Sequence, residues 1–260
     1  MSGGRILVVL PTLGERLDTL ELTLASVEEQ RQDVDLTLVV VVPEKATAAR
    51  ELAQRHAAVL VDDPMKGISH AINLGVQASS EEDYYAWIGD DDLFLPHALK
   101  TLRELIEQRE GVVVSYGACR YIDPDGHVLR TNTAGRLAKW LLPWGPNLIP
   151  HPGSMIRLSA LREVGLFDES LKYAMDLDVF LSLRRTGDFI GTRVAVSAFR
   201  WHPDSLTVSA RKKSGEESEM IKRRHLPRGL RAISPIWSVP VRWAASLAAR
   251  SLNASAKKND

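Results

Sequence analysis

Three successive carboxylates, Asp90-Asp91-Asp92, are the residues of this sequence best suited to chemistry. They follow the apolar run 84–88, which is typical of a short buried strand, and Pro96 begins a helical pattern. The carboxylates are therefore expected at the carboxyl end of a strand and outside the core, where open α/β sheets bind ligands. Mg²⁺ or Mn²⁺ would relieve their mutual repulsion. The alternative is a solvated acidic turn in which Asp92 caps the following helix.

Asp176 and His202 are two further candidates for chemistry. Asp176 lies in the first turn of a predicted helix that begins at Met175, where the helix dipole alone would favour a carboxylate. His202 follows a predicted strand at 195–201, a position in which a lone histidine is more often structural. We interpret the single cysteine, Cys119, as a small buried residue rather than a catalytic thiol, and one cysteine fits a reducing compartment.

The first half of the chain alternates between apolar runs and helical patterns. Predicted strands occupy 5–10, 36–42, 58–61 and 84–88, and this alternation favours a parallel sheet with right-handed crossovers. The sequence has no G-x-x-x-x-G-K-[ST] and no G-x-G-x-x-G motif. Phosphates of a bound nucleotide would therefore need a metal ion rather than a glycine-rich loop.

The second half is less regular. A strand is predicted at 112–121, and the segment 131–150 is irregular and contains Trp140 and Trp144. Exposed aromatic side chains there could stack on sugar rings, and the alternative is a small hydrophobic plug beneath the loop.

The composition describes a globular protein whose formal net charge is zero, with 33 Lys and Arg against 33 Asp and Glu, which argues against a nucleic-acid partner. No signal peptide and no spanning segment are recognisable, so a cytoplasmic location is expected. We predict a mobile charged linker at 209–225 and an amphipathic helical tail at 226–260. The tail, with Trp237 and Trp243, could contact the inner face of a membrane or dock on the protein's own core.

Taken in order, several segments resemble the family 2 glycosyltransferases, and the resemblance covers roughly 5–208. The segments are Val8-Val9-Leu10-Pro11-Thr12, Lys66 to Asn73, Trp87 to Asp92, His151-Pro152-Gly153 with Val164 to Glu169, Tyr173 to Asp178, and Arg200-Trp201-His202. The resemblance implies the GT-A fold, an α/β fold with a Rossmann-like, mostly parallel central sheet flanked by helices. It also implies one domain at 1–208, with a nucleotide-sugar half at 5–110 and an acceptor half at 111–208.

The same resemblance implies roles for individual residues. A catalytic base is implied at Asp176, metal ligands at Asp91, Asp92 and His202, and acceptor contacts at His151 and Trp144. Contacts with the nucleotide-sugar are implied for Pro11, Thr12, Glu15, Glu44, Asp63, Lys66, Gly67, Asn73, Asp90 and Asp91. The implied reaction is an inverting transfer, dependent on Mn²⁺ or Mg²⁺, from a nucleoside-diphosphate sugar to a hydroxyl of a glycan or lipid-linked acceptor.

The sequence departs from the family's pattern at three positions. Pro43-Glu44 stands where the second strand usually ends in Asp, Gly89 stands at the first acidic position of the metal motif, and Met175 replaces a Glu. Glu44, Asp62 or Asp63 could substitute for the first of these. These departures motivate the alternative of a degenerate glycan- or partner-binding protein. A separate alternative is a sugar-nucleotide nucleotidyltransferase, which would need a glycine-rich basic loop after the first strand, and the segment 11–16 is a poor substitute for one. The Q-x-x-R-W motif of processive synthases is absent, which favours single additions.

Overall fold

The computed structural model describes residues 3–133, 138–145, 147–201 and 211–231. Its centre is a sheet of nine strands within these residues, in the order β3-β2-β1-β4-β8-β6-β9-β5, with β7 paired to β6. The strands are β1 (Ile6–Pro11), β2 (Leu36–Val42), β3 (Val59–Asp62), β4 (Tyr84–Trp87), β5 (Leu93–Phe94), β6 (Val112–Ile122), β7 (Val128–Asn132), β8 (Ser154–Arg157) and β9 (Asp188–Arg200). The helices are α1 (Leu17–Gln30), α2 (Thr47–Arg55), α3 (Ile68–Gln77), α4 (Ala98–Glu107), α5 (Ala138–Leu141), α6 (Leu158–Glu163), α7 (Met175–Leu183), α9 (Arg211–His225) and α10 (Arg228–Arg231), with a 3-10 turn at His151–Gly153.

The first half of the sheet is parallel, as predicted. Strand β1 pairs in parallel with β2 and β4, and β2 pairs in parallel with β3. The second half is mixed, because β8 runs antiparallel to both β4 and β6, whereas β6 and β9 are parallel. The carboxyl ends of β1, β2, β3 and β4 therefore meet at one edge of the sheet.

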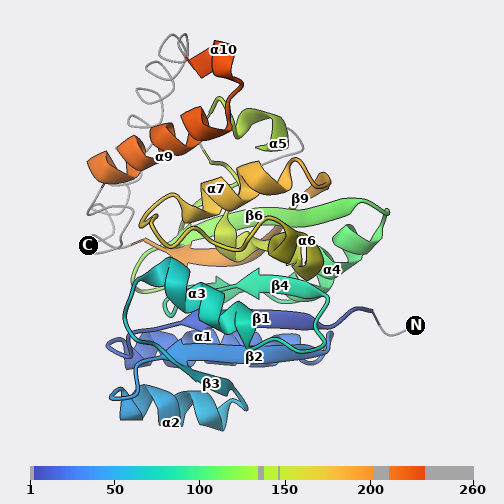
Figure 1. Ribbon diagram of the computed structural model, residues 1–260. Helices are drawn as coiled ribbons and strands as arrows, with labels where there is room; N and C mark the ends of the chain where they lie inside the picture. Colours follow the sequence, from blue (N-terminus) through green and yellow to red (C-terminus); the bar gives the residue numbers. More distant parts are fainter. Residues whose placement is uncertain (1–2, 134–137, 146, 202–210, 232–260) are drawn as a thin grey trace.

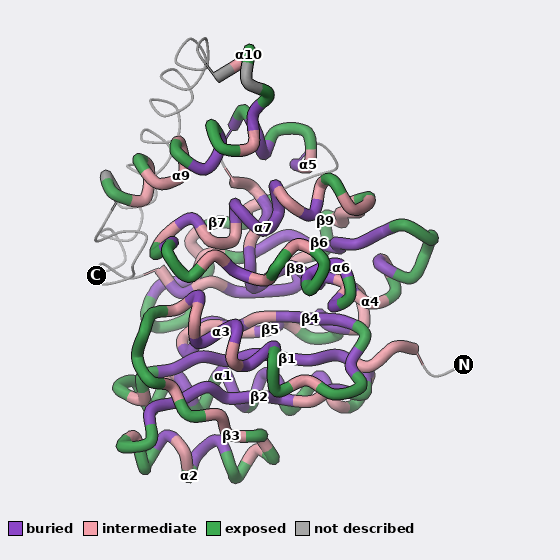
Figure 2. Tube along the Cα trace, in the orientation of Figure 1, coloured by how far each residue is buried: buried purple, intermediate pink, exposed green. Residues whose placement is uncertain are grey.

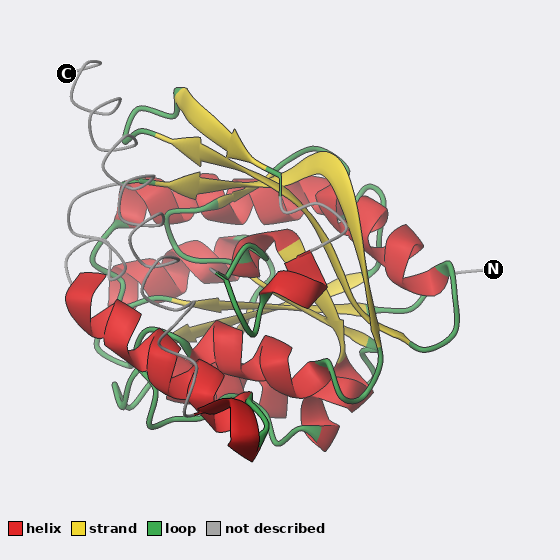
Figure 3. Cartoon of the chain, turned by 90° about the horizontal axis from the view of Figure 1, so that it is seen from above, coloured by secondary structure: helices red, strands yellow, loops and turns green. Residues whose placement is uncertain are grey.

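Helices cover both faces of the sheet (Figures 1 and 3). Alternate residues of β1 enter two separate cores: Leu7 and Val9 pack with α3, α6 and α7, and Ile6, Val8 and Leu10 pack with α1, α2 and α4. Burial is accordingly concentrated in the central strands (Figure 2). Because both faces of these strands are buried, their sequences are continuous apolar runs.

The prediction of a mobile linker at 209–225 is wrong for residues 211–225, which form helix α9. Its side chain Ile221 is fully buried against the core that contains α7. The helix could not be predicted from the charged sequence, because α9 buries few apolar side chains and its charged side chains bind other elements of the fold. Of the predicted tail, the described part includes α10, and residues 232–260 lie outside it. No helix in the described ranges combines the length and apolar character needed to cross a membrane.

Candidate functional site

The carboxyl ends of β1 and β4 bring Thr12 and Asp90 into contact. The Thr12 hydroxyl donates a buried hydrogen bond of 2.7 Å to Asp90 Oδ2, and the Thr12 N–H donates to the carbonyl of Val41. The Thr12 hydroxyl oxygen also accepts the N–H of Gly14. Burial raises the pKa of Asp90. These bonds fix the loop after β1 against the acidic cluster, and the contacts of Pro11, Thr12 and Asp90 with a nucleotide-sugar remain a prediction.

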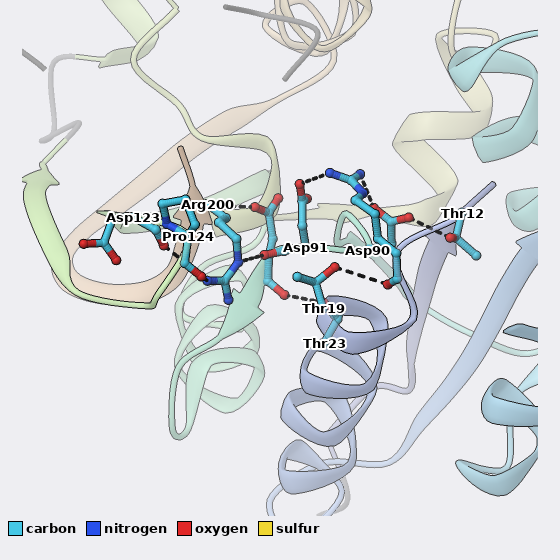
Figure 4. Close-up of polar contacts among 10 residues, drawn as sticks. Thr12, Thr19, Thr23, Asp90, Asp91, Asp123, Pro124 and Arg200 are labelled. Carbon is cyan, nitrogen blue, oxygen red and sulfur yellow. Dashed lines mark hydrogen bonds and ion pairs between the residues drawn. The ribbon is translucent and has the colours of Figure 1, made fainter. Parts of the chain in front are cut away.

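Asp92 lies in the core and is only 1% exposed, so the expectation that all three carboxylates stand outside the core is wrong. Its Oδ1 accepts the backbone N–H of Arg200 at 3.1 Å, and its carbonyl accepts the Thr23 hydroxyl at 2.8 Å (Figure 4). Burial, and then the charge of Asp91, hold the pKa of Asp92 well above its usual range. The alternative in which Asp92 caps the next helix is also wrong, since α4 begins at Ala98 with His97 as its N-cap residue.

Asp91 and Asp92 converge on one small space beside Gly89. A Cβ built on Gly89 would lie 3.1 Å from Asp92 Oδ2 and 3.3 Å from Asp91 Oδ1. A side chain at this position would therefore crowd the two carboxylates. Two converging carboxylate oxygens suit Mg²⁺ or Mn²⁺, so these residues fit the implied metal. The third predicted ligand, His202, lies outside the described residues.

Arg16, which the sequence did not single out, pairs with this cluster. Its guanidinium contacts Asp91 Oδ2 at 2.6 Å and Asp90 Oδ1 at 2.5 Å, and its side chain is 46% exposed. Figure 4 shows Asp90 and Asp91 side by side in these contacts. Arg16 therefore offsets the charge of two carboxylates, and a cation that binds Asp91 must compete with it.

Arg16→Met is expected to strengthen Mn²⁺ binding in the absence of donor by about 1.4- to fivefold. An exposed ion pair contributes roughly 0.2–1 kcal/mol, and 1.4 kcal/mol corresponds to a factor of ten. Titration calorimetry with Mn²⁺ alone measures the effect. Arg109→Met is the matched control, because Arg109 forms an exposed pair with Asp188 at 3.0 Å. Equal affinities in parent and Arg16→Met would show that Arg16 does not compete for the cation.

A second group of potential ligands lies in the turn after β6. Within the described ranges, Asp123, Asp125 and His127 are the three side chains whose ligand atoms come within 4.8 Å of one another. Asp123 is already engaged, since its Oδ1 accepts the His127 N–H at 2.8 Å, and Asp125 and His127 are exposed. Arg200 links this turn to the acidic cluster by donating to the carbonyls of Asp91 and Pro124 (Figure 4).

Other residues implied to bind the nucleotide-sugar lie along the same sheet edge. Glu15 is exposed after β1, Glu44 is exposed after β2, and Lys66 is exposed after β3. Asp63 Oδ1 accepts the N–H of Met65 at 2.8 Å. Gly67 has a φ of +114° with open space where a Cβ would project, so its backbone is accessible to a ligand. The structure thus brings these residues to one edge, and their contacts with a nucleotide remain a prediction.

Asn73 and His151 have other partners in the structure. Asn73 joins α3 to the turn at Phe167, accepting that residue's N–H at 3.0 Å and donating to its carbonyl at 2.9 Å. His151 is buried and stacks on Trp87 with ring centroids 4.5 Å apart. Burial lowers the pKa of His151 to about 3, so it is neutral. These contacts account for both residues without a bound sugar or nucleotide.

Asp176 stands in the first turn of α7 and is half-buried. Its Oδ2 accepts a hydrogen bond of 2.8 Å from Asn147, and its Oδ1 accepts the Leu177 N–H at 2.7 Å. Burial raises the pKa of Asp176 to about 6, in spite of these donors. Asn147 lies in an irregular segment where no periodicity marks single residues, so sequence reasoning missed it.

The start of α7 lies beside the start of α3. The Ser69 hydroxyl contacts the Leu171 carbonyl and the Met175 sulfur, each at 3.1 Å. Because the loop 63–67 joins the carboxyl end of β3 to the start of α3, we infer that Asp176 lies toward the edge of the sheet that holds the acidic cluster. Met175, which replaces the family's Glu, is part of this packing.

The remaining sequence candidates are an aromatic pair and a cysteine. Trp140 is 64% exposed and Trp144 is 38% exposed, in and just after α5, so the predicted acceptor contact of Trp144 stays a prediction. Cys119 is buried, as interpreted, and burial raises its pKa to about 12. A thiol with this pKa is not ionised at neutral pH.

Comparison with known proteins matches residues 7–165 to the family described as glycosyl transferase family 2. An uncharacterized glycosyltransferase of Rickettsia typhi is 25% identical over 151 residues, covering 55% of this chain and 47% of the relative. A Rickettsia prowazekii relative is 24% identical over the same shares of each chain. The chain thus spans about half the length of the curated relatives it matches.

Solved structures share the fold. The mannosyltransferase PcManGT from Pyrobaculum calidifontis, in complex with GDP-Man and Mn²⁺, superposes with a TM-score of 0.66 at 17% identity, over 96% of this chain and 76% of that one. Residues 1–349 of Staphylococcus aureus TarS give a TM-score of 0.60 at 14% identity, over 87% and 72% of the two chains. At these identities the likeness identifies the fold, and it agrees with the GT-A architecture predicted from the sequence.

Proposed function

Because the chain belongs to the glycosyl transferase family 2, and is therefore an enzyme of glycosyl transfer, we propose that it catalyses an inverting, metal-dependent reaction. The donor is a nucleoside-diphosphate sugar, and the acceptor is a hydroxyl of a glycan or a lipid-linked glycan. The observation that carries this proposal is the half-buried carboxylate of Asp176 at the sheet edge that also holds Asp91 and Asp92. The complex of the Pyrobaculum neighbour with GDP-Man and Mn²⁺ supports the classes of donor and cation.

Asp176 is proposed as the general base. Asn147 and the Leu177 N–H hold its two oxygens, and a pKa of about 6 suits a base that works near neutral pH. Asp176 takes the proton of the acceptor hydroxyl while that oxygen attacks the anomeric carbon, from the side opposite the leaving diphosphate. A single displacement of this kind inverts the configuration at that carbon.

Asp91 and Asp92 are proposed to hold the cation, together with His202. Held there, Mg²⁺ or Mn²⁺ would offset the charge that develops on the diphosphate as the bond between the anomeric carbon and the phosphate oxygen breaks. The loops that carry Thr12, Glu44 and Asp63 are proposed to hold the nucleoside, and Trp144 to contact the acceptor sugar.

Release of nucleoside diphosphate across a panel of sugar nucleotides, with Mn²⁺ or with EDTA, tests the function. Metal-dependent release that requires an acceptor supports transfer. A protein that binds glycan but releases no diphosphate would be the degenerate alternative, which the departures at Pro43, Gly89 and Met175 favour. Consumption of a nucleoside triphosphate and sugar phosphate would instead identify a nucleotidyltransferase.

The segment 226–260 is proposed to hold the enzyme at a membrane that carries a lipid-linked acceptor. We expect the full chain to co-sediment with anionic vesicles at low salt, because each basic residue near such a surface contributes about 1 kcal/mol, screened by salt. A chain ending at Arg231 retains α9 and α10 and is expected to stay in solution. Equal sedimentation of the two chains, or none with either, would contradict the proposal.

A further inference from the structure

Helix α9 packs on α7, the helix that carries Asp176, and both helices follow the segment 7–165 that matches the family. Ile221 is fully buried in the core that also contains Leu177 and Phe180 of α7. Figure 1 shows α9 running alongside α7 on the outer side of that helix layer. The candidate base and the helix that packs against it therefore both lie outside the family's matched region.

Glu217 of α9 binds the backbone that leads into α7. Its Oε1 accepts the N–H of Lys172 at 3.1 Å, and its Oε2 accepts the N–H groups of Tyr173 and Ala174 at 2.6 and 2.7 Å. The N-cap residue of α7, Ala174, has no side chain that could cap the helix. A carboxylate at this place satisfies donors at the start of the helix and interacts favourably with the helix dipole.

A hydrogen bond and an ion pair hold α9 in the position that lets Glu217 reach this backbone. His225 Nε2 contacts Asp178 Oδ1 at 2.8 Å, and Arg224 contacts Asp168 Oδ2 at 2.8 Å. The contacts of α9 thus fall on both sides of Asp176, on residues 172–174 before it and on Asp178 after it.

We propose that Glu217 is a positioning residue for the reaction: its carboxylate fixes the turn 172–174 and thereby the placement of the base Asp176. This inference rests on the proposed role of Asp176. Ala174 is two residues from Asp176, so a displaced turn moves the carboxylate directly. A catalytic group misplaced by about 1 Å can lower the rate by about a hundredfold.

The charge of Glu217 has a second consequence for Asp176. After burial, which is the main cause, the negative charge of Glu217 also raises the pKa of Asp176. The other groups that bond Asp176, namely the Asn147 amide and the Leu177 N–H, are uncharged, and Asp178 on its own helix pairs with His225. Loss of the Glu217 charge should therefore let Asp176 ionise at lower pH.

Glu217→Gln is the test, with Glu216→Gln as its control because Glu216 is exposed on the same helix. We expect kcat to fall on the order of 10- to 100-fold with the KM for donor unchanged, because the backbone N–H groups of 172–174 lose their charged acceptor. The acid limb of the kcat/KM profile should move to lower pH, and amide exchange at 172–174 should accelerate. Glu216→Gln should match the parent in all three measurements.

A double variant separates this inference from the proposed function. On an Asp176→Asn background, Glu217→Gln should reduce the residual turnover little further, because it acts through Asp176. Parent-like kcat and pH profile in Glu217→Gln, or full additivity in the double variant, would overturn the positioning role even if Asp176 is the base. Full activity of Asp176→Asn alone would instead overturn the proposed function. If Glu217→Gln does not fold, Glu217→Asp replaces it, because this variant keeps the charge but has a shorter side chain that draws the carboxylate away from the turn 172–174. A kcat equal to the parent's in Glu217→Asp would then contradict the proposal.

Discussion

Asp176→Asn is expected to lower turnover by about 10²- to 10⁴-fold while leaving donor binding intact, because removal of a positioned base typically has this effect. The amide keeps the shape of the side chain, and its oxygen can still accept the Leu177 N–H that now bonds Asp176 at 2.7 Å. It cannot take a proton from the acceptor at neutral pH. Single-turnover kinetics and titration of the donor in the presence of Mn²⁺ measure the two quantities separately.

Asp178→Asn is the matched control, since Asp178 lies two residues along the same helix and pairs with His225. Asp178 helps to hold α9 against α7 but takes no proton, so Asp178→Asn should lower turnover less than Asp176→Asn does. The pH profile of the parent gives a further check: kcat/KM should fall tenfold per unit as pH decreases below about 6, because protonation of Asp176, whose pKa is raised to about 6, removes the base. Turnover of Asp176→Asn within a few-fold of the parent would show that Asp176 is not the base.

The strands could be predicted from the sequence where both of their faces are buried. Strand β2 occupies 36–42, as predicted, because its seven residues form an apolar run that packs on helices from both sides. Strand β7 was not predicted, since it is a largely exposed edge with no alternation of apolar and polar residues. Strand β9 begins at Asp188 rather than at the predicted 195, because its first half mixes polar and apolar residues and is partly exposed.

The sequence predicted which segments form the candidate site better than it predicted which side chains interact there. Asp90 lies at the predicted edge and Asp176 in the predicted first turn of α7, because the order of strands and motifs determines where each loop emerges. Arg16, Asn147 and Glu217 escaped notice because each acts on a carboxylate or backbone remote in sequence, which no local pattern encodes. Asn73 occupies its motif position, yet its amide is bonded to the turn at Phe167.

Asp91→Asn is expected to weaken Mn²⁺ binding, and with it Mn²⁺-dependent donor binding, by at least about 100-fold. Substitution of a residue that only supports a metal ligand lowers metal affinity by about 10- to 100-fold, so loss of a ligand itself should lower the affinity at least as much. Asp91 is a cleaner test than Asp92, because its side chain is 15% exposed and pairs with Arg16. Removing the Asp92 carboxylate would leave the buried Arg200 N–H without its acceptor, at a stability cost of about 1–3 kcal/mol.

Asp125→Asn completes this experiment, because Asp125 belongs to the other group of potential ligands, with Asp123 and His127. If the cation binds between Asp91 and Asp92, Asp125→Asn keeps the parent's affinity for Mn²⁺ and for the donor. Arg200 joins the two places, so a small indirect change would still be compatible with this assignment. The opposite result, in which Asp125→Asn loses Mn²⁺ binding and Asp91→Asn retains it, would move the metal site to the turn after β6 and leave the acidic cluster as the partner of Arg16.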